Sequence, residues 1–309
     1  MYKYIIKRLL LLVLVIIGVS FMIYFVMDLA PGDPVRAILG EEATQEEYEA
    51  LRHEMGFDRP VIVRYLEYMW NLLHGDLGFS YKYGKDVWEL YSQRLPATML
   101  LALSATIVAT VLSIPMGIFA ALKQGSIQDN VVSAFSTFGL AAPNFWVGLM
   151  LIIIFALNLG WFSSGGYENW TDVILPAVTL GTGHMALVTR TTRSSMIDVL
   201  RQDYLMLARA KGVSEKKVVT RHALKNALIP IITVTGMQVS TSLGGSVITE
   251  SVFSWPGVGR LVIDAIKSQD VETVTGAIIM TSIITSMILL LVDILYAFVD
   301  PRIKAQYSK

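Results

Sequence analysis

The sequence predicts an all-α membrane protein with six transmembrane helices. The chain has 309 residues, of which 54% are hydrophobic and 16% charged, whereas a soluble domain carries about 25% charged residues. The apolar residues also stand in blocks near the roughly 20 residues that a helix needs to cross a membrane. A formal net charge of zero argues against a nucleic-acid partner. The absence of cysteine excludes disulfides and thiolate metal sites.

Six stretches meet or approach the length of a membrane span. The first is preceded by Lys3, Lys7 and Arg8, as in a signal peptide, but it runs for 19 residues without a charge. That is longer than the 7–15 residues of a usual signal core, so we expect a retained helix. The predicted spans are residues 9–27, 95–122, a segment within 130–167 that ends near 159, 173–189, 227–249 and 273–298.

The distribution of Lys and Arg predicts the orientation. The N-terminus is basic, and residues 190–225 carry nine Lys and Arg against three acids. Basic segments stay in the cytoplasm, so both termini and this segment are expected there. Residues 1–29 then hold the N-terminus and first span, residues 30–94 form a long external loop, and residues 95–309 hold the other five spans.

The external loop has its own helix signals. Thr44 followed by Glu47 fits a capping box, which predicts a helix over residues 45–55. Residues 60–73 are rich in aromatic side chains and predict a second helix.

Residues 190–229 contain two predicted helical pieces around one break. The first runs from about 191 to 210 and the second to about 226. Gly212 suits a helix C-terminus, because glycine adopts the left-handed conformation cheaply. Ser214 suits an N-cap, and Glu215 is favourable beside it. Pro230 is expected in the first turn of span five.

The second piece carries a basic face, and composition leaves its role open. This face suits an acidic partner or anionic lipid, but an ordinary cytoplasmic loop has the same composition. Its residues are Lys216, Lys217, Arg221 and Lys225.

Three runs of residues in this segment are specific. They are Asp203-Tyr204, Ala208-Arg209-Ala210-Lys211-Gly212 and Arg221-His222-Ala223-Leu224-Lys225-Asn226-Ala227-Leu228-Ile229-Pro230. Their order resembles the coupling loop of ABC importer permeases, in particular the dipeptide, oligopeptide and nickel permease family. Where the wider class has a Glu-Ala-Ala triplet six residues before a glycine, this chain has Met206-Leu207-Ala208 before Gly212. Absence of the Glu is usual in the peptide group.

Other segments extend the resemblance over nearly the whole chain. The long loop at 30–94 is similar to that of the B-type permease subunit, which lacks a longer N-terminal extension. The similar segments are Ala30-Pro31-Gly32-Asp33-Pro34, Gly75-Asp76-Leu77-Gly78-Phe79-Ser80, Glu250 through Leu261, and Asp300-Pro301-Arg302.

The resemblance implies a type I ABC importer permease fold, no enzymatic activity, and a place in the cytoplasmic membrane of a bacterium or archaeon. The implied partners are a second homologous permease, two ABC ATPases, an extracytoplasmic substrate-binding protein and membrane lipid. ATP and Mg would be bound by the ATPases, since the chain has no Walker A sequence, and no cofactor is expected on this chain alone. The residues expected at the ATPase are Ala208, Arg209, Ala210, Lys211, Gly212, Val213, Ser214 and Glu215.

Three residues are candidates for the pathway. Asp293 is the only acid well inside a span, where a charge is costly and often functional, although a structural partner near the cytoplasmic end is an alternative. His184 either meets substrate or is a satisfied buried histidine. Asn144, beside Pro143, either lines the pathway or caps a kink.

The turn after span five is a candidate for docking the external binding protein, or else it packs the loop between spans. Its residues are Glu250, Trp255, Pro256 and Gly257.

Two other protein classes have little support. A membrane protease would need a motif such as H-E-x-x-H, which is missing, and an ion-coupled transporter would need more intramembrane charge than Asp293. Peptides are the expected cargo. Nickel, a metal chelate and glutathione remain alternatives.

Overall fold

The computed structural model describes residues 2–30, 32–40 and 42–299, with side chains except at 2–5, 7–9, 245 and 293–299. The basic tail and the predicted motif at 300–302 therefore lie outside the described residues. Packing divides the chain into two compact units. One contains residues 99–255 and the described chain from 287 onward, and the other contains residues 2–98 and 256–286. Two long helices, α5 (Val87–Leu122) and α14 (Val271–Val299), each pass from one unit into the other.

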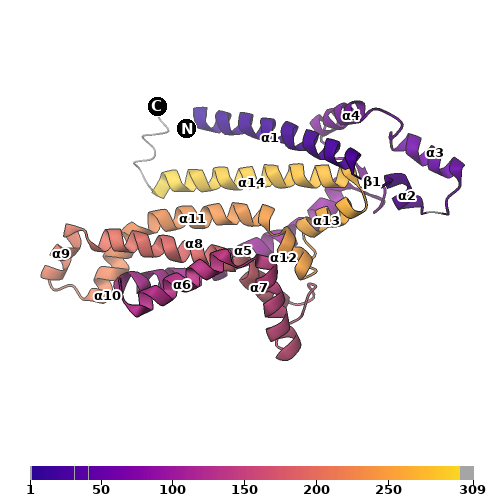
Figure 1. The fold of residues 1–309 in the computed structure, drawn as a ribbon. Coiled ribbons are helices and arrows are strands. Elements are labelled where there is room, and N and C mark those ends of the chain that lie inside the picture. Colours follow the sequence, from indigo (N-terminus) through magenta and orange to yellow (C-terminus); the bar gives the residue numbers. More distant parts are fainter. Residues whose placement is uncertain (1, 31, 41, 300–309) are drawn as a thin grey trace. The chain divides into compact units, whose positions relative to one another are not determined.

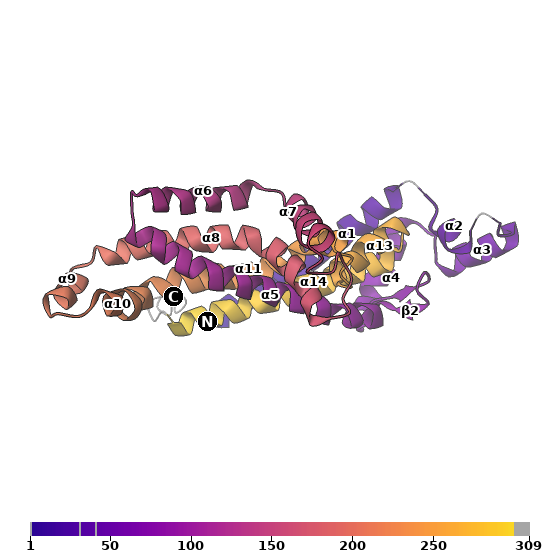
Figure 2. The same ribbon diagram turned by 90° about the horizontal axis from the view of Figure 1, so that it is seen from below.

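The first unit is a bundle built around α8 (Ile174–Leu200), which runs beside α6 on one side and α11 on another (Figures 1 and 2). Its other elements are α6 (Ile127–Ala141), α7 (Asn144–Leu151), a π-helix (Ile152–Asn158), a 3-10 turn (Trp170–Val173), α9 (Asp203–Ala210), α10 (Glu215–Lys217), a second π-helix (Val218–Ala223), α11 (Leu224–Gly245) and α12 (Val247–Val252).

Glycines allow the helices of this bundle to approach closely. A Cβ at Gly117 of α5 would stand 2.8 Å from the carbonyl oxygen of Thr189 in α8. One at Gly181 of α8 would stand 3.0 Å from the carbonyl oxygen of Ala105 in α5. Lipid gives little hydrophobic force between helices, so small residues at such crossings contribute by letting backbones pack together.

The span predicted within residues 130–167 is broken into two helices. The structure has α6 and α7, which meet at an angle of 105°. Pro143 explains the break: the residue before a proline favours extended backbone, and Ala142 has φ −69° and ψ 126°. The 15 residues of α6 are about 22 Å long, short of the roughly 30 Å hydrocarbon core.

The other predicted spans are confirmed as helices. Within the described chain, five helices are long and apolar enough to cross a membrane, or six if the bent pair of α6 and α7 is counted as one span. Each of them extends beyond its predicted bounds at one end or both, and two do so by ten residues or more. The fourth span continues to Leu200, and the fifth belongs to a helical stretch that already starts at Glu215.

The second unit contains the long loop between α1 and α5. Its elements are α1 (Tyr2–Leu29), α2 (Pro34–Leu39), α3 (Gln45–Glu54), α4 (Val61–Leu73), the antiparallel strands β1 (Phe79–Ser80) and β2 (Lys85–Asp86), α13 (Val258–Lys267) and the first part of α14. The capping box is confirmed: the backbone N–H of Glu47 donates to the Thr44 hydroxyl at 3.3 Å, and that of Thr44 donates to the Glu47 carboxylate at 2.9 Å. The helix predicted over 60–73 is confirmed as α4.

The short helix α2 was not predicted. Asp33 caps it by accepting from the backbone N–H of Val35 at 2.9 Å, and Pro34 occupies its first turn. The Tyr48 hydroxyl of α3 donates to the other oxygen of Asp33 at 2.7 Å. Burial acts to raise the pKa of Asp33, but the bonds from Tyr48 and the backbone outweigh it and hold that pKa below its ordinary value. One carboxylate thus caps α2 and fastens α3 to it.

A cluster of tyrosines forms the core between α1, α4 and α14. Tyr24, Tyr65 and Tyr68 are buried together with Ile279. The rings of Tyr24 and Tyr65 meet edge to face, with centroids 5.6 Å apart, an arrangement that aromatic pairs favour. This cluster fixes α4 against the ends of two membrane helices.

Candidate functional site

The candidate site is the connection between α8 and α11, residues 201–223, which we call the elbow. It contains α9, a turn at 211–214, α10 and the second π-helix. Figures 1 and 2 show α9 and α10 at one end of the α8–α11 pair, whereas α7 lies toward the other end of α8.

The turn of the elbow is a complete Schellman motif. Gly212 has φ +77°, the left-handed conformation expected of it. Its N–H donates to the carbonyl of Arg209 at 2.9 Å, and the N–H of Val213 donates to the carbonyl of Ala208 at 3.2 Å. These two bonds satisfy carbonyls that a helix end leaves without partners. The glycine therefore sets the direction in which the chain leaves α9.

An ion pair closes the same turn from outside. The Arg209 guanidinium donates to the two carboxylate oxygens of Glu215 at 3.0 and 2.8 Å. This two-bond geometry is specific to arginine, and the hydrogen bond to Glu215 raises the pKa of Arg209 above its ordinary value. Both side chains are exposed to water, so the pair adds little to the free energy of unfolding. Its effect is to fix the geometry of the turn.

Apolar side chains anchor the elbow to the bundle. Leu205 of α9 and Val218 of the π-helix have no exposed surface, and they share one cluster with Met196 of α8. Ala208 and Val213, on either side of the turn, pack against this cluster. The tip remains exposed at Ala210 through Gly212. The elbow is thus a fixed turn with a free outer surface.

One predicted detail of the elbow was wrong, and another was confirmed in position only. The helix expected over 191–210 is interrupted at residues 201–202, so α9 is separate from α8. Ser214 stands at the N-cap position with extended backbone, but its side chain makes no capping hydrogen bond. The carboxylate of the next residue, Glu215, is held by Arg209.

The prediction that Pro230 starts span five was also wrong, because the helix runs through it without a break. Proline has no N–H to donate to the carbonyl four residues earlier. The π-helix at 218–223 leads directly into α11, the helix that contains Pro230. The side-chain amide of Asn226 donates to the carbonyl of His222 at 2.9 Å and to the hydroxyl of Tyr204 in α9 at 2.8 Å. Asn226 therefore both completes this helix and fastens it to α9.

The structure also contains an ion pair that we did not predict. Arg193 of α8 donates to both oxygens of Asp129 in α6, at 2.5 and 2.7 Å. Asp129 is 2% exposed and also accepts from the N–H of Gly125 at 2.9 Å. The pair joins α6 to α8 at the end of α8 from which the elbow continues.

The three pathway candidates do not form a cluster. Asn144 begins α7, half-buried, after the Pro143 break, and His184 lies half-buried in α8. Within the described residues, the buried Nδ1 of His184 has no hydrogen-bond partner, and no hydrogen bond joins it to Asn144. Asp293 belongs to α14, but its side chain lies outside the described part. Their assignment to a pathway remains a prediction.

Three of the four docking candidates, Glu250, Trp255 and Gly257, are buried, and Pro256 is half-buried. Glu250 and Trp255 are 0% exposed. The Trp255 ring packs on Tyr167 with centroids 4.5 Å apart, and the Glu250 carboxylate accepts from Ser246 at 2.9 Å. Burial favours the alternative role of packing the turn, and docking by Pro256 and Gly257 stays a prediction.

Comparison with known sequences places the chain in a family. The family described as binding-protein-dependent transport system inner membrane component matches residues 113–305, and the corresponding N-terminal family matches residues 1–102. The chain belongs to this family, whose members are multi-pass permease components of ABC importers.

Individual relatives match along their whole length. The oligopeptide transport system permease protein AppB of Bacillus subtilis is 40% identical, over 98% of this chain and 100% of the relative. The dipeptide transport system permease protein DppB of Escherichia coli K12 is 38% identical, over 98% and 99%. The glutathione transport system permease protein GsiC of the same strain is 37% identical, over 98% and 99%.

Solved structures agree on the fold. A chain of the MetNI methionine ABC transporter in an inward-facing conformation superposes with a TM-score of 0.59 at 16% identity, over 68% of this chain and 96% of the other. A chain of an amino acid ABC transporter gives 0.51 at 19% identity, over 67% and 93%. The predicted type I ABC importer permease fold is thus confirmed.

Proposed function

We propose that this chain is the permease subunit of an ATP-driven importer of di- and oligopeptides, and that it forms half of the translocation pathway beside a second homologous permease. The permease class follows from the family. The peptide cargo is supported by relatives named for dipeptide and oligopeptide transport, which match over essentially the whole chain. Glutathione, itself a small peptide, is supported by a relative of nearly equal identity.

The elbow couples this permease to ATP hydrolysis by two ABC ATPases, which bind the nucleotide and its Mg. One observation carries this proposal. The glycine turn is held to the bundle by Ala208 and Val213, whereas residues 210–212 at its tip are exposed. Because α9 packs on the cluster containing Met196 and Val218, force applied at the tip reaches α8 and the stretch leading to α11 together. Elements that move as rigid bodies transmit such motion. An extracytoplasmic binding protein delivers the peptide on the opposite side.

Substitution of Gly212 tests the coupling role. A Cβ at Gly212 would meet no atom within 4 Å, so a side chain there costs only the left-handed backbone, φ +77°. That conformation costs roughly 1–2 kcal/mol for most residues and most for β-branched ones. We expect Gly212→Val to abolish peptide uptake by reconstituted transporter while the chain still reaches the membrane.

Asparagine tolerates the left-handed region better than other non-glycine residues, which makes Gly212→Asn the matched control. It should retain a large part of the uptake. Normal uptake by well-expressed Gly212→Val protein would count against the coupling role, and equal loss in both variants would show that the side chain itself, and not the backbone, is at fault.

The cargo is tested with the whole transporter. Binding protein, both permeases and ATPases reconstituted in proteoliposomes are expected to accumulate a labelled dipeptide in an ATP-dependent manner, and excess unlabelled tripeptide should compete. Competition by glutathione alone would assign the alternative cargo. Uptake that follows an ion gradient without ATP would contradict the proposal as a whole.

A further inference from the structure

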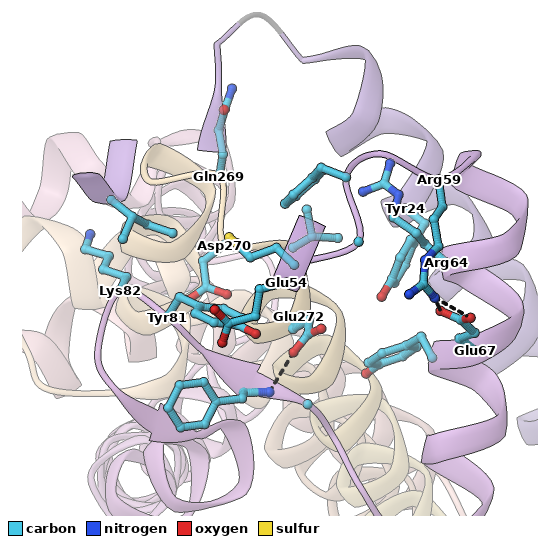
Figure 3. Close-up of a pocket in the computed structure, with 18 of the residues that line it drawn as sticks. Tyr24, Glu54, Arg59, Arg64, Glu67, Tyr81, Lys82, Gln269, Asp270 and Glu272 are labelled. Atoms are coloured by element: carbon cyan, nitrogen blue, oxygen red, sulfur yellow. Dashed lines mark hydrogen bonds and ion pairs between the residues drawn. The ribbon is translucent and has the colours of Figure 1, made fainter. Parts of the chain in front are cut away.

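A pocket in the second unit has a wall of aromatic rings and carboxylates (Figure 3). It is lined from distant parts of the sequence: α1, the segment around α3 and α4, the β1 region, and the first turn of α14. No sequence motif pointed to it. Its aromatic members are Tyr24, Phe57, Tyr68, Phe79 and Tyr81.

Two arginines of the wall already have acidic partners. Arg59 donates to both oxygens of Glu67 at 2.7 and 3.0 Å. Arg64 pairs with Asp28 and lies over the ring of Phe57, 4.5 Å from its centroid. These cations are therefore neutralised without using the remaining carboxylates of the pocket.

The remaining carboxylates gather in the middle of the pocket. Figure 3 shows Glu54, Asp270 and Glu272 around Tyr81, with Lys82 to one side. The Lys82 ammonium donates to a backbone carbonyl, that of residue 264, at 3.4 Å. Negative charge thus exceeds positive charge at this point.

Glu272 differs from its neighbour Asp270 in how fully it is bonded. Asp270 accepts from the hydroxyl of Thr273 at 2.8 Å and from Ser80, so its carboxylate is used in capping α14. Glu272 accepts from the N–H of Phe79 through Oε2 at 2.6 Å. No described residue donates a hydrogen bond to its Oε1. Glu272 is half-buried, so one of its two oxygens remains open to a further donor, and a cation is the donor that a carboxylate binds most strongly.

Tyr68 supplies a second group without a partner. Its side chain is 4% exposed, and within the described chain its buried hydroxyl has no hydrogen-bond partner. Buried tyrosine hydroxyls usually find one. Burial, and next the charge of Glu272, raise the pKa of Tyr68; burial and the charges of Glu54 and Glu272 do the same for Tyr81. Glu272 lines the same pocket as both rings.

We propose that this pocket binds an organic ammonium group, which donates to Oε1 of Glu272 and to the Tyr68 hydroxyl and lies among the aromatic rings. An ammonium carries three donors and no acceptor, which complements two unused acceptors. Aromatic faces attract cations within about 6 Å of the ring centre. The ammonium comes from a lysine side chain of a docked protein or from the amino end of a free peptide.

The test measures binding to the full-length chain in lipid nanodiscs by isothermal titration calorimetry, with four amidated tripeptides. Acetylated Gly-Lys-Gly carries only a side-chain ammonium, and Gly-Gly-Gly carries only a terminal one. Acetylated Gly-Gly-Gly is neutral, and acetylated Gly-Glu-Gly is acidic. We expect one or both ammonium peptides to bind and the other two not to bind, and the preferred one identifies the source.

Variants locate the site. Glu272→Gln retains an oxygen for the N–H of Phe79 but loses the charge, and it should weaken binding by about tenfold or more. Tyr68→Phe should weaken binding less. If Glu272→Gln fails to fold, Tyr68→Phe is the variant that decides whether the pocket is the binding site. Glu46→Gln, in the exposed first turn of α3, is the matched control and should bind normally.

Three results would overturn the proposal: no binding of either ammonium peptide, equal or better binding of the neutral or acidic peptide, or unchanged affinity in both pocket variants. The experiment needs no ATPase, so a negative result leaves the proposed transport function standing. Likewise, loss of transport in Gly212→Val does not affect this binding.

Discussion

At the scale of single residues, one buried carboxylate joins two helices beside the proposed coupling site. Asp129 accepts two bonds from Arg193 and one from the backbone of Gly125. Removing one member of such a pair leaves a charge and a backbone N–H without partners. The pair thereby holds α6 and α8 together where the elbow begins.

Asp129→Ala is expected to lower stability by about 2–3 kcal/mol, because bonds to charged groups contribute about 1.5–3 kcal/mol. For a chain of this size the loss corresponds to a fall in unfolding temperature of roughly 5 °C or more, measured by thermal unfolding in mild detergent. Asp129→Asn keeps an acceptor for Gly125 and should lose less. An unchanged unfolding temperature in Asp129→Ala would show that the pair contributes nothing.

At the scale of elements, the features that were predicted correctly are those determined by residues close together in the sequence. The break at Gly212 was predicted because a left-handed turn has a residue signature, and α3 because its capping box lies within four residues. The π-helix before Pro230 was not predicted, because no local residue signature indicates one. The bond from Asn226 to Tyr204 joins two helices and is likewise absent from any local pattern. A kink at Pro143 was expected from the proline, but the size of the bend, 105°, was not predictable, because an uncharged, apolar stretch does not indicate where a span turns.

The candidate site was predicted in part for the same reason. The elbow was found through motif order, and its Schellman turn follows from the glycine. The Arg193–Asp129 pair joins residues 64 positions apart, and the pocket at Glu272 joins segments about 190 positions apart. Neither the ion pair nor the pocket leaves a periodic pattern or a fixed spacing of residues in the sequence, because each forms only when distant segments pack together. The role of Trp255 was left open between docking and packing of the turn, and its ring is buried against Tyr167.

At the scale of the whole molecule, the chain is one part of an assembly. Large apolar side chains remain exposed along its membrane helices, such as Leu14, Val111 and Met287. Lipid and a second permease of the same fold are the partners that such surfaces suit in a membrane. The predicted orientation puts the basic elbow on the cytoplasmic side, where the proposed ATPases bind.

The most direct test is site-specific labelling and cross-linking of the elbow tip in native membranes. The chain has no cysteine, so Lys211→Cys gives a single thiol at an exposed position. We predict that a membrane-impermeant maleimide reaches it only in inside-out vesicles, and that a short bismaleimide joins it to an ABC ATPase subunit in a nucleotide-dependent way. Labelling in right-side-out vesicles, with no cross-link to an ATPase, would contradict the account.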